Sequence, residues 1–210
     1  MRFKEVLPNI YYIKFKTQKE LCSTFLRFQE YYESPKFRSK IFTLKEFKKW
    51  YTKNSKKGKE TNKFTYYSDW SGFNIPSSIL KPFYKEKFNP LSKKEKTFLD
   101  LFTDIKGDFY IIGTYGIKKV VKHEIAHGLF YVNNSYKKEV LRILNKINKE
   151  YRDKINNYLS ISGGYHERSW EDETHAYLLT NTWDLLDTGI DKKILIRYRK
   201  KLNQIYKMYS

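Results

Sequence analysis

The sequence has one cysteine, Cys22, in 210 residues. A lone cysteine cannot form an intrachain disulfide, so a reducing compartment is the expected environment. No run of about 18 apolar residues is present, so a transmembrane helix is not expected. The first residues, Met1–Glu5, lead into polar sequence without the apolar core of a signal peptide. Together, these absences predict an intracellular, cytoplasmic location.

Arginine and acidic residues are scarce beside lysine. The chain has 34 lysines, 8 arginines and 23 acids, which gives a formal net charge of +19. Phosphate clamping and base recognition favour arginine, so we interpret most of the excess as composition on solvated faces. One dense cluster leaves open a weak contact with nucleic acid or another acidic surface. It comprises Lys45, Lys48, Lys49, Lys53, Lys56, Lys57, Lys59 and Lys63.

The rest of the composition is that of a folded protein. Hydrophobic residues make up 40% and aromatic residues 18% of the chain, more than a disordered chain carries. The length suits one domain. We expect a single domain over 1–210, with an N-terminal helical and irregular lobe at 1–105 and a core at 106–210.

Local patterns predict several elements in the first lobe. The β-branched and aromatic segment 10–15 predicts a strand. Helices are expected over 18–33, after Thr43 and after Ser92, each opened by the spacing of a capping box. Segment 54–62 is expected to be an exposed loop, and 64–84 an irregular packed segment or short strands.

The second half has stronger periodicity. A strand is expected over 108–114, followed by helices over about 117–131, 137–158, 170–186 and 191–208. Gly163 and Gly164 separate the second and third of these helices.

Histidine is also scarce, and two of the four histidines stand together in His123-Glu124-Ile125-Ala126-His127. On a helix, positions i and i+4 share one face, so both imidazoles can bind one cation. Glu124 lies about 100° further round the helix, where it can address a metal-bound water without ligating the metal. Zinc lowers the pKa of such water to roughly 7. The alternative is a helix with two buried, hydrogen-bonded histidines and a surface glutamate.

This pentapeptide resembles the H-E-x-x-H motif of zincin metallopeptidases. The extended metzincin motif would need glycine at 130 and histidine at 133, where this chain has Phe130 and Asn133. The remaining common arrangement, found in gluzincins, takes a glutamate from a later helix as third ligand. Glu173 is the favoured residue, because Ala176 and Tyr177 follow it at helical spacing. Asp172, His175 and Glu171 remain alternatives, as does an ordinary acid at a helix N-terminus.

The resemblance covers about 109–186 and implies an α+β, helix-rich fold with a small sheet. In the superfamily, the strand before the motif helix is the sheet edge that pairs with an extended peptide. Carried over here, Tyr110, Ile112 and Gly113 would bind substrate. The chain departs from the gluzincin second motif Asn-Glu-x-x-Ser-Asp at 172 and 176–177.

Three alternative functions are therefore considered, in order of decreasing preference. The first is a zinc-dependent peptidase that holds zinc through His123, His127 and Glu173 and uses Glu124 as general base. His166 is the candidate for stabilising the oxyanion, with a surface histidine as its alternative. The second is a zincin-derived module that binds a protein and cuts nothing. The third is a basic protease associated with nucleic acid.

Overall fold

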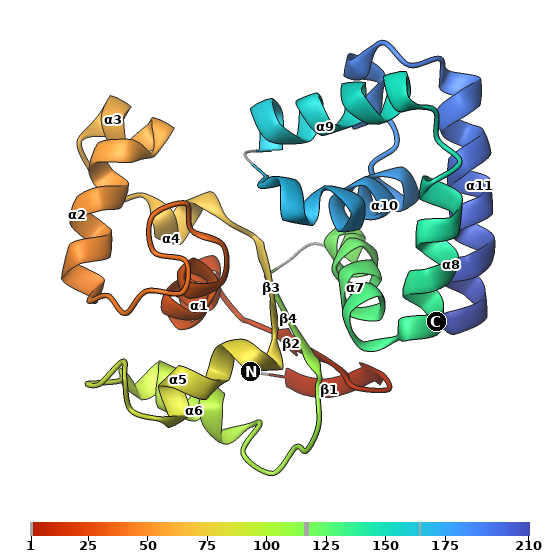
Figure 1. Cartoon of the computed structure of the whole chain (residues 1–210). Helices are drawn as coiled ribbons and strands as arrows, with labels where there is room; N and C mark the ends of the chain where they lie inside the picture. The colour runs from red at the N-terminus through yellow and green to blue at the C-terminus, as the bar shows by residue number, and fades with distance from the viewer. Residues whose placement is uncertain (1, 116–117, 164) are drawn as a thin grey trace. The chain divides into compact units, whose positions relative to one another are not determined.

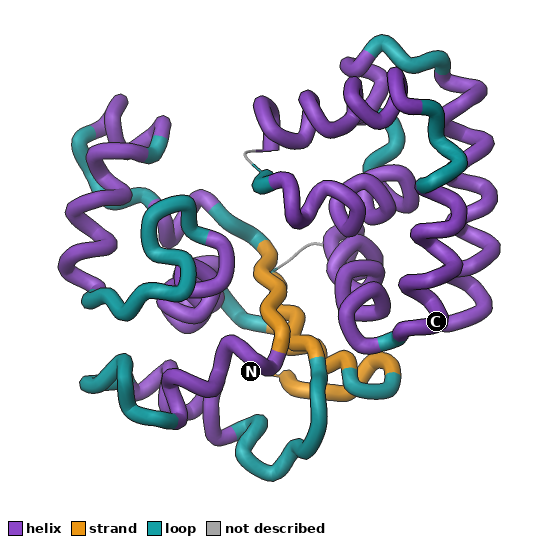
Figure 2. Tube along the Cα trace, in the orientation of Figure 1, coloured by secondary structure: helices purple, strands orange, loops and turns teal. Residues whose placement is uncertain are grey.

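The computed structural model describes residues 2–115, 118–163 and 165–210. It divides into two compact units, Met1–Lys118 and Lys119–Ser210 (Figure 1). This division lies further along the chain than the expected lobe boundary at 105/106. The single domain expected over 1–210 stays a prediction. The α+β class is confirmed, and all the strands described lie in the first unit (Figure 2).

A four-stranded mixed sheet organises the first unit. Its order is β1-β2-β4-β3, with β2 parallel to β4 and the other two pairs antiparallel. The strands are β1 (Arg2–Leu7), β2 (Ile10–Lys14), β3 (Gly72–Pro76) and β4 (Tyr110–Thr114).

The expectation that β4 is a free edge is wrong. Both of its sides are already hydrogen-bonded, to β2 and to β3, and all five of its residues are buried. A Cβ added at Gly113 would lie 2.4 Å from Phe25 Cε2, so glycine here permits close packing of α1 on the sheet. Tyr110 donates its hydroxyl hydrogen to Asn74 Oδ1 on β3. Tyr110, Ile112 and Gly113 are therefore structural residues of the sheet.

Short helices surround a core of aromatic side chains in this unit. Phe25 stacks on Phe73 of β3 with ring centroids 5.5 Å apart, and it meets Phe98 edge-on at 4.9 Å. Thr43 and Ser92 form complete capping boxes with Glu46 and Glu95, as the sequence predicts. The helices are α1 (Gln18–Glu33), α2 (Leu44–Asn54), α3 (Lys56–Thr61), α4 (Tyr66–Asp69), α5 (Lys81–Tyr84) and α6 (Lys93–Asp100), with the 3₁₀ turn η1 (Ser77–Leu80).

The second unit consists of helices joined by turns and short loops, and no strand occurs among its described residues. Apolar side chains from α8, α10 and α11 meet in its interior, among them Val140, Leu178 and Leu202. Its elements are α7 (Lys118–Val132), α8 (Asn134–Leu144), α9 (Lys149–Gly163), η2 (Glu167–Ser169), α10 (Trp170–Thr180), η3 (Asp184–Thr188) and α11 (Lys192–Tyr209).

Three expected boundaries are wrong. The helix expected over 137–158 is two helices, because α8 ends at Leu144 and Asn148 starts α9 by accepting a hydrogen bond from Tyr151 N at 2.8 Å. Segment 54–62 contains the helix α3 rather than only a loop. The helix expected over 170–186 ends at Thr180. The expected helix start at Ile117 lies outside the described residues.

No helix among the described residues is both long and apolar enough to cross a membrane.

Candidate metal centre

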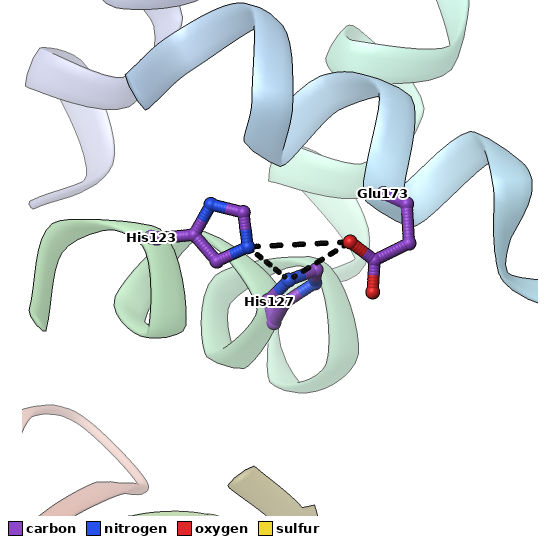
Figure 3. A group of neighbouring side chains, drawn as sticks. All are labelled: His123, His127 and Glu173. Atoms are coloured by element: carbon purple, nitrogen blue, oxygen red, sulfur yellow. Dashed lines mark hydrogen bonds and ion pairs between the residues drawn. The ribbon is translucent and has the colours of Figure 1, made fainter. Parts of the chain in front are cut away.

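Two helices of the second unit supply the candidate site. His123 and His127 lie one turn apart on α7, and Glu173 projects toward them from the first turn of α10 (Figure 3). The spacing of four residues puts both imidazoles on one face of α7. Ala126 is fully buried, and such a small side chain allows another helix to pack closely against α7.

The three side chains converge on one point. His123 Nε2 lies 3.2 Å from His127 Nε2, and Glu173 Oε2 lies 4.0 Å from the first nitrogen and 3.8 Å from the second. Ligands of a tetrahedral zinc ion at about 2.0–2.1 Å are separated by roughly 3.3 Å. The distances found are close enough to that value for small side-chain movements to complete three-point ligation.

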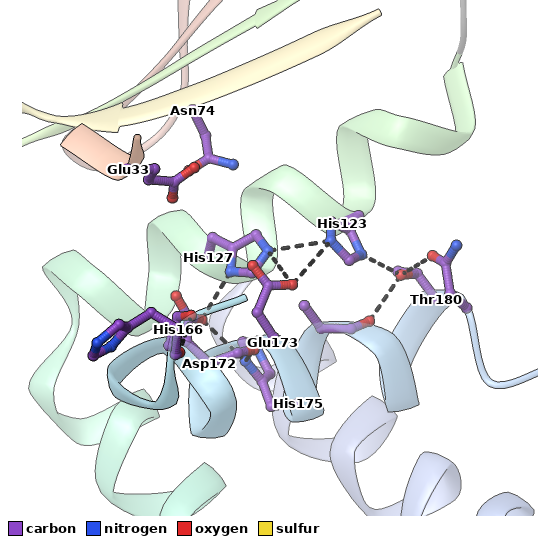
Figure 4. A network of polar contacts seen from close by, with 12 residues as sticks. Glu33, Asn74, His123, His127, His166, Asp172, Glu173, His175 and Thr180 are labelled. Atoms are coloured by element: carbon purple, nitrogen blue, oxygen red, sulfur yellow. Dashed lines mark hydrogen bonds and ion pairs between the residues drawn. The ribbon is translucent and has the colours of Figure 1, made fainter. Parts of the chain in front are cut away.

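Asp172 holds the outer nitrogen of His127. Its Oδ1 lies 2.9 Å from His127 Nδ1 and 3.4 Å from His175 Nδ1 (Figure 4). His175 is fully buried, with its Nδ1 2.8 Å from the Asp172 carbonyl oxygen and its Nε2 3.1 Å from the Tyr136 hydroxyl. A carboxylate at Nδ1 keeps a hydrogen on that atom and points Nε2 inward, as zinc-binding histidines require.

Thr180 orients the imidazole of His123, as Asp172 orients that of His127. Its Oγ1 lies 2.9 Å from His123 Nδ1, and its hydroxyl has carbonyl acceptors at 2.8 Å on Ala176 and 2.7 Å on the Asn181 side chain. Because the hydroxyl hydrogen is directed to one of these acceptors, the oxygen is free to accept from His123 Nδ1–H. Burial, with His127 and His175 nearby, lowers the pKa of His123 to about 3, so this imidazole stays neutral with a lone pair on Nε2.

The electrostatic field at the site favours positive charge. Burial disfavours a charged His127, but the carboxylates of Asp172, Glu173 and Glu124 outweigh burial and hold the pKa of His127 well above its ordinary value. Burial also opposes ionisation of Asp172, yet His127 and His175 hold the pKa of its carboxyl well below its usual range. In the chain alone, the favoured positive charge is a proton on His127. The same field favours a metal cation there.

The structure brings together His123, His127 and Glu173, whose ligand atoms all lie within 4.8 Å of one another. The expectation of a metal-binding triad from these three residues is thus confirmed as geometry. The alternative third ligands lie differently. Asp172 contacts the outer nitrogen of His127 and also His175, while the side chain of Glu171 is exposed.

His166 is not brought to this cluster. Its ring is exposed, accepts a hydrogen bond from Arg168 N at 3.3 Å and so caps η2. In Figure 4 the ring points away from the three candidate ligands. Tyr177 does contact a candidate ligand, since its ring centroid lies 5.6 Å from that of His123 in an edge-on arrangement.

Sequence reasoning missed Thr180 and considered Asp172 only as an alternative third ligand. Thr180 follows Glu173 by seven residues, which is two helical turns. That spacing places it on the face that already carries Glu173, Ala176 and Tyr177, so the signal was present in the sequence. The contact of Asp172 with His127 had no such signal, because it depends on how α10 packs against α7.

Comparison of the chain with protein-family models, curated proteins and solved structures found no match.

Proposed function

We propose that the chain is a zinc-dependent peptidase with a zincin-like, gluzincin-type catalytic core. The observation that carries this proposal is the convergence of His123 Nε2, His127 Nε2 and Glu173 Oε2 from α7 and α10. The Nδ1 atoms of both histidines are held from outside by Asp172 and Thr180. A helix with two histidines of purely structural importance has no need of such paired orientation.

The donor set fits zinc by its chemistry. Two imidazole nitrogens and one carboxylate oxygen form a ligand set of catalytic zinc sites, which keep a fourth position open. Hard cations such as Mg²⁺ and Ca²⁺ prefer oxygen ligands alone. The side chain of His123 is 16% exposed, whereas that of His127 is 3% exposed, so solvent approaches the cluster from the side of His123.

When bound, zinc would lower the pKa of a coordinated water and polarise the peptide carbonyl. The residues of the chain supply positioning and proton transfer. Glu124 is 7% exposed and follows His123 directly on α7, and its charge acts on His127. In this proposal the Glu124 carboxylate accepts a proton from the attacking water and gives it to the departing amine.

The test compares the wild type with Glu124→Gln, which keeps the shape of the side chain and removes its basicity. We expect zinc content and helicity to be unchanged and cleavage of an unfolded protein mixture to fall by about 10²–10⁴-fold. Glu171→Gln is the matched control, since it makes the same change at an exposed acid of α10, and it should cleave as the wild type does.

Equal cleavage by the wild type and Glu124→Gln, with zinc present in both, would contradict the proposed role of Glu124. Zinc binding without any cleavage by the wild type would support the non-catalytic binding module instead.

A further inference from the structure

A stripe of lysines runs along one face of α2 in the first unit. Lys45, Lys49 and Lys53 follow one another at intervals of four residues, about 6 Å along the helix axis, and all three are exposed. The opposite face carries Phe47 and Tyr51, which are buried in the aromatic core. The stripe is therefore held in a fixed direction by the packing of its own helix.

These charges have little compensation nearby. Of the eight lysines in 44–63, Lys57 alone forms an ion pair in the part of the chain that the structure describes, with Asp69 at 2.9 Å. Glu46 forms no ion pair with these lysines among the described residues, because its carboxylate turns back to accept the backbone N–H and hydroxyl of Thr43.

Other helices of the same molecule do pair their basic residues. Arg142 lies 2.8 Å from Glu139 on α8, and Lys154 lies 2.7 Å from Glu150 on α9. Neighbouring positions on the stripe are separated by about 6 Å of helical rise, less than the Debye length of about 8 Å at physiological salt, so their potentials add. A row of this kind is stabilised by an anion that carries repeated charges.

We propose that this stripe, Lys45, Lys49 and Lys53, binds the phosphate backbone of nucleic acid without reading its sequence. Segment 44–63 contains no arginine, and lysine binds phosphate as a point charge, whereas arginine also forms the bidentate contacts that distinguish bases. A lipid surface fits less well, because membrane-bound helices insert apolar side chains beside their basic ones. On α2, the aromatic Phe47 and Tyr51 point into the core instead, and Leu44 is exposed beside the lysines.

Replacing all three lysines with glutamine tests the proposal, because glutamine removes charge and has a helix propensity similar to that of lysine. The matched control is K193Q/K200Q/K207Q on α11, where three lysines at intervals of seven residues are also exposed. Each triple variant changes the formal net charge from +19 by three, to +16. Binding to a fluorescent DNA duplex of random sequence is measured by anisotropy between 50 and 200 mM salt.

We expect K45Q/K49Q/K53Q to bind about a hundredfold more weakly near 0.1 M salt, with a salt slope smaller by about 3. The α11 control should bind within about twofold of the wild type, and K45R/K49R/K53R, which keeps the charges, should also bind. Circular dichroism and urea unfolding establish that each variant is folded. If the glutamine triple does not fold, the single variant K49Q replaces it, with an expected slope change of about 1.

Equal losses in the two glutamine triples would overturn the proposal, since they would mean that net charge alone sets the affinity. No binding by the wild type at 50 mM salt would overturn it too. A third outcome would assign the stripe to a membrane surface instead. In that case vesicles containing anionic lipid would displace the DNA, and their binding would require the same three lysines. None of these results depends on zinc or on peptidase activity.

Discussion

In the first unit, the buried Arg27 guanidinium lies 2.6 Å from each carboxylate oxygen of Glu95, whereas in the second unit three carboxylates surround His127. The first arrangement is balanced, because one positive and one negative side chain meet with side-chain exposures of 9% and 6%. The second has an excess of negative charge in a buried place. Buried charge is costly unless it is paired, so the carboxylates of the second unit favour a positive charge at His127, which the side chains there supply as a proton.

The charge balance of the Arg27–Glu95 pair in the first unit can be tested by removing one of the two charges. Arg27→Met leaves the Glu95 carboxylate buried without its partner, and we expect a loss of about 3–5 kcal/mol in the free energy of unfolding. The double variant Arg27→Met/Glu95→Gln, which removes both charges, should cost less than Arg27→Met alone. Urea unfolding measures both. A loss below about 1 kcal/mol in Arg27→Met would mean that the pair does not stabilise the first unit.

The excess of negative charge around His127 in the second unit can be tested by measuring zinc binding. Asp172→Asn keeps an oxygen near His127 Nδ1 but removes the charge, and we expect zinc to bind about 10–100-fold more weakly. Competition with a chromophoric chelator gives the affinity. Glu171→Gln, an exposed acid beside it on α10, should bind zinc as the wild type does. An unchanged zinc affinity in Asp172→Asn would show that Asp172 does not contribute to zinc binding.

A smaller effect is expected from Glu30, an acid of the first unit whose pKa is shifted by burial. Burial raises the pKa of Glu30 to about 7, although the nearby side chains of Tyr66 and Ser34 act to lower it. Between about pH 4.5 and 7 the folded chain therefore holds more protons at Glu30 than the unfolded chain does. Stability from this group is present at low pH and is lost as the pH rises through 7.

Glu30→Gln cannot ionise, so it should be more stable than the wild type at pH 8, by on the order of 1 to 2 kcal/mol, with little difference at pH 4.5. Urea unfolding at the two pH values checks this. A difference that is the same at both would show that Glu30 does not titrate in the folded chain as described.

The sequence predicted local features well and non-local ones poorly. The helix from Gln18 to Glu33, with its Thr17 cap, was correctly bounded because apolar spacing and capping residues are both written within one segment. The apolar positions Val140, Leu144 and Ile147 keep helical spacing across the gap between α8 and α9. Periodicity alone therefore could not locate that break.

The place of β4 in the sheet depended on partners that carry weak local signals. β1 lies in a charged segment that was not expected to be a strand, and β3 is five residues long, bounded by Gly72 and Pro76. Without these strands, β4 looks like an edge. In the site, the spacing within α7 predicted the two histidines, but the approach of Asp172 to His127 arises only from packing between helices.

Elemental analysis of the purified, zinc-reconstituted chain is the most direct test of the central claim that His123, His127 and Glu173 form one zinc site. We expect about one zinc per chain in the wild type and in Glu171→Ala, whose altered acid is exposed on the same helix as Glu173. We expect zinc to be lost from His123→Ala and Glu173→Ala while circular dichroism shows that the helices remain. Full zinc retention in Glu173→Ala would contradict the claim.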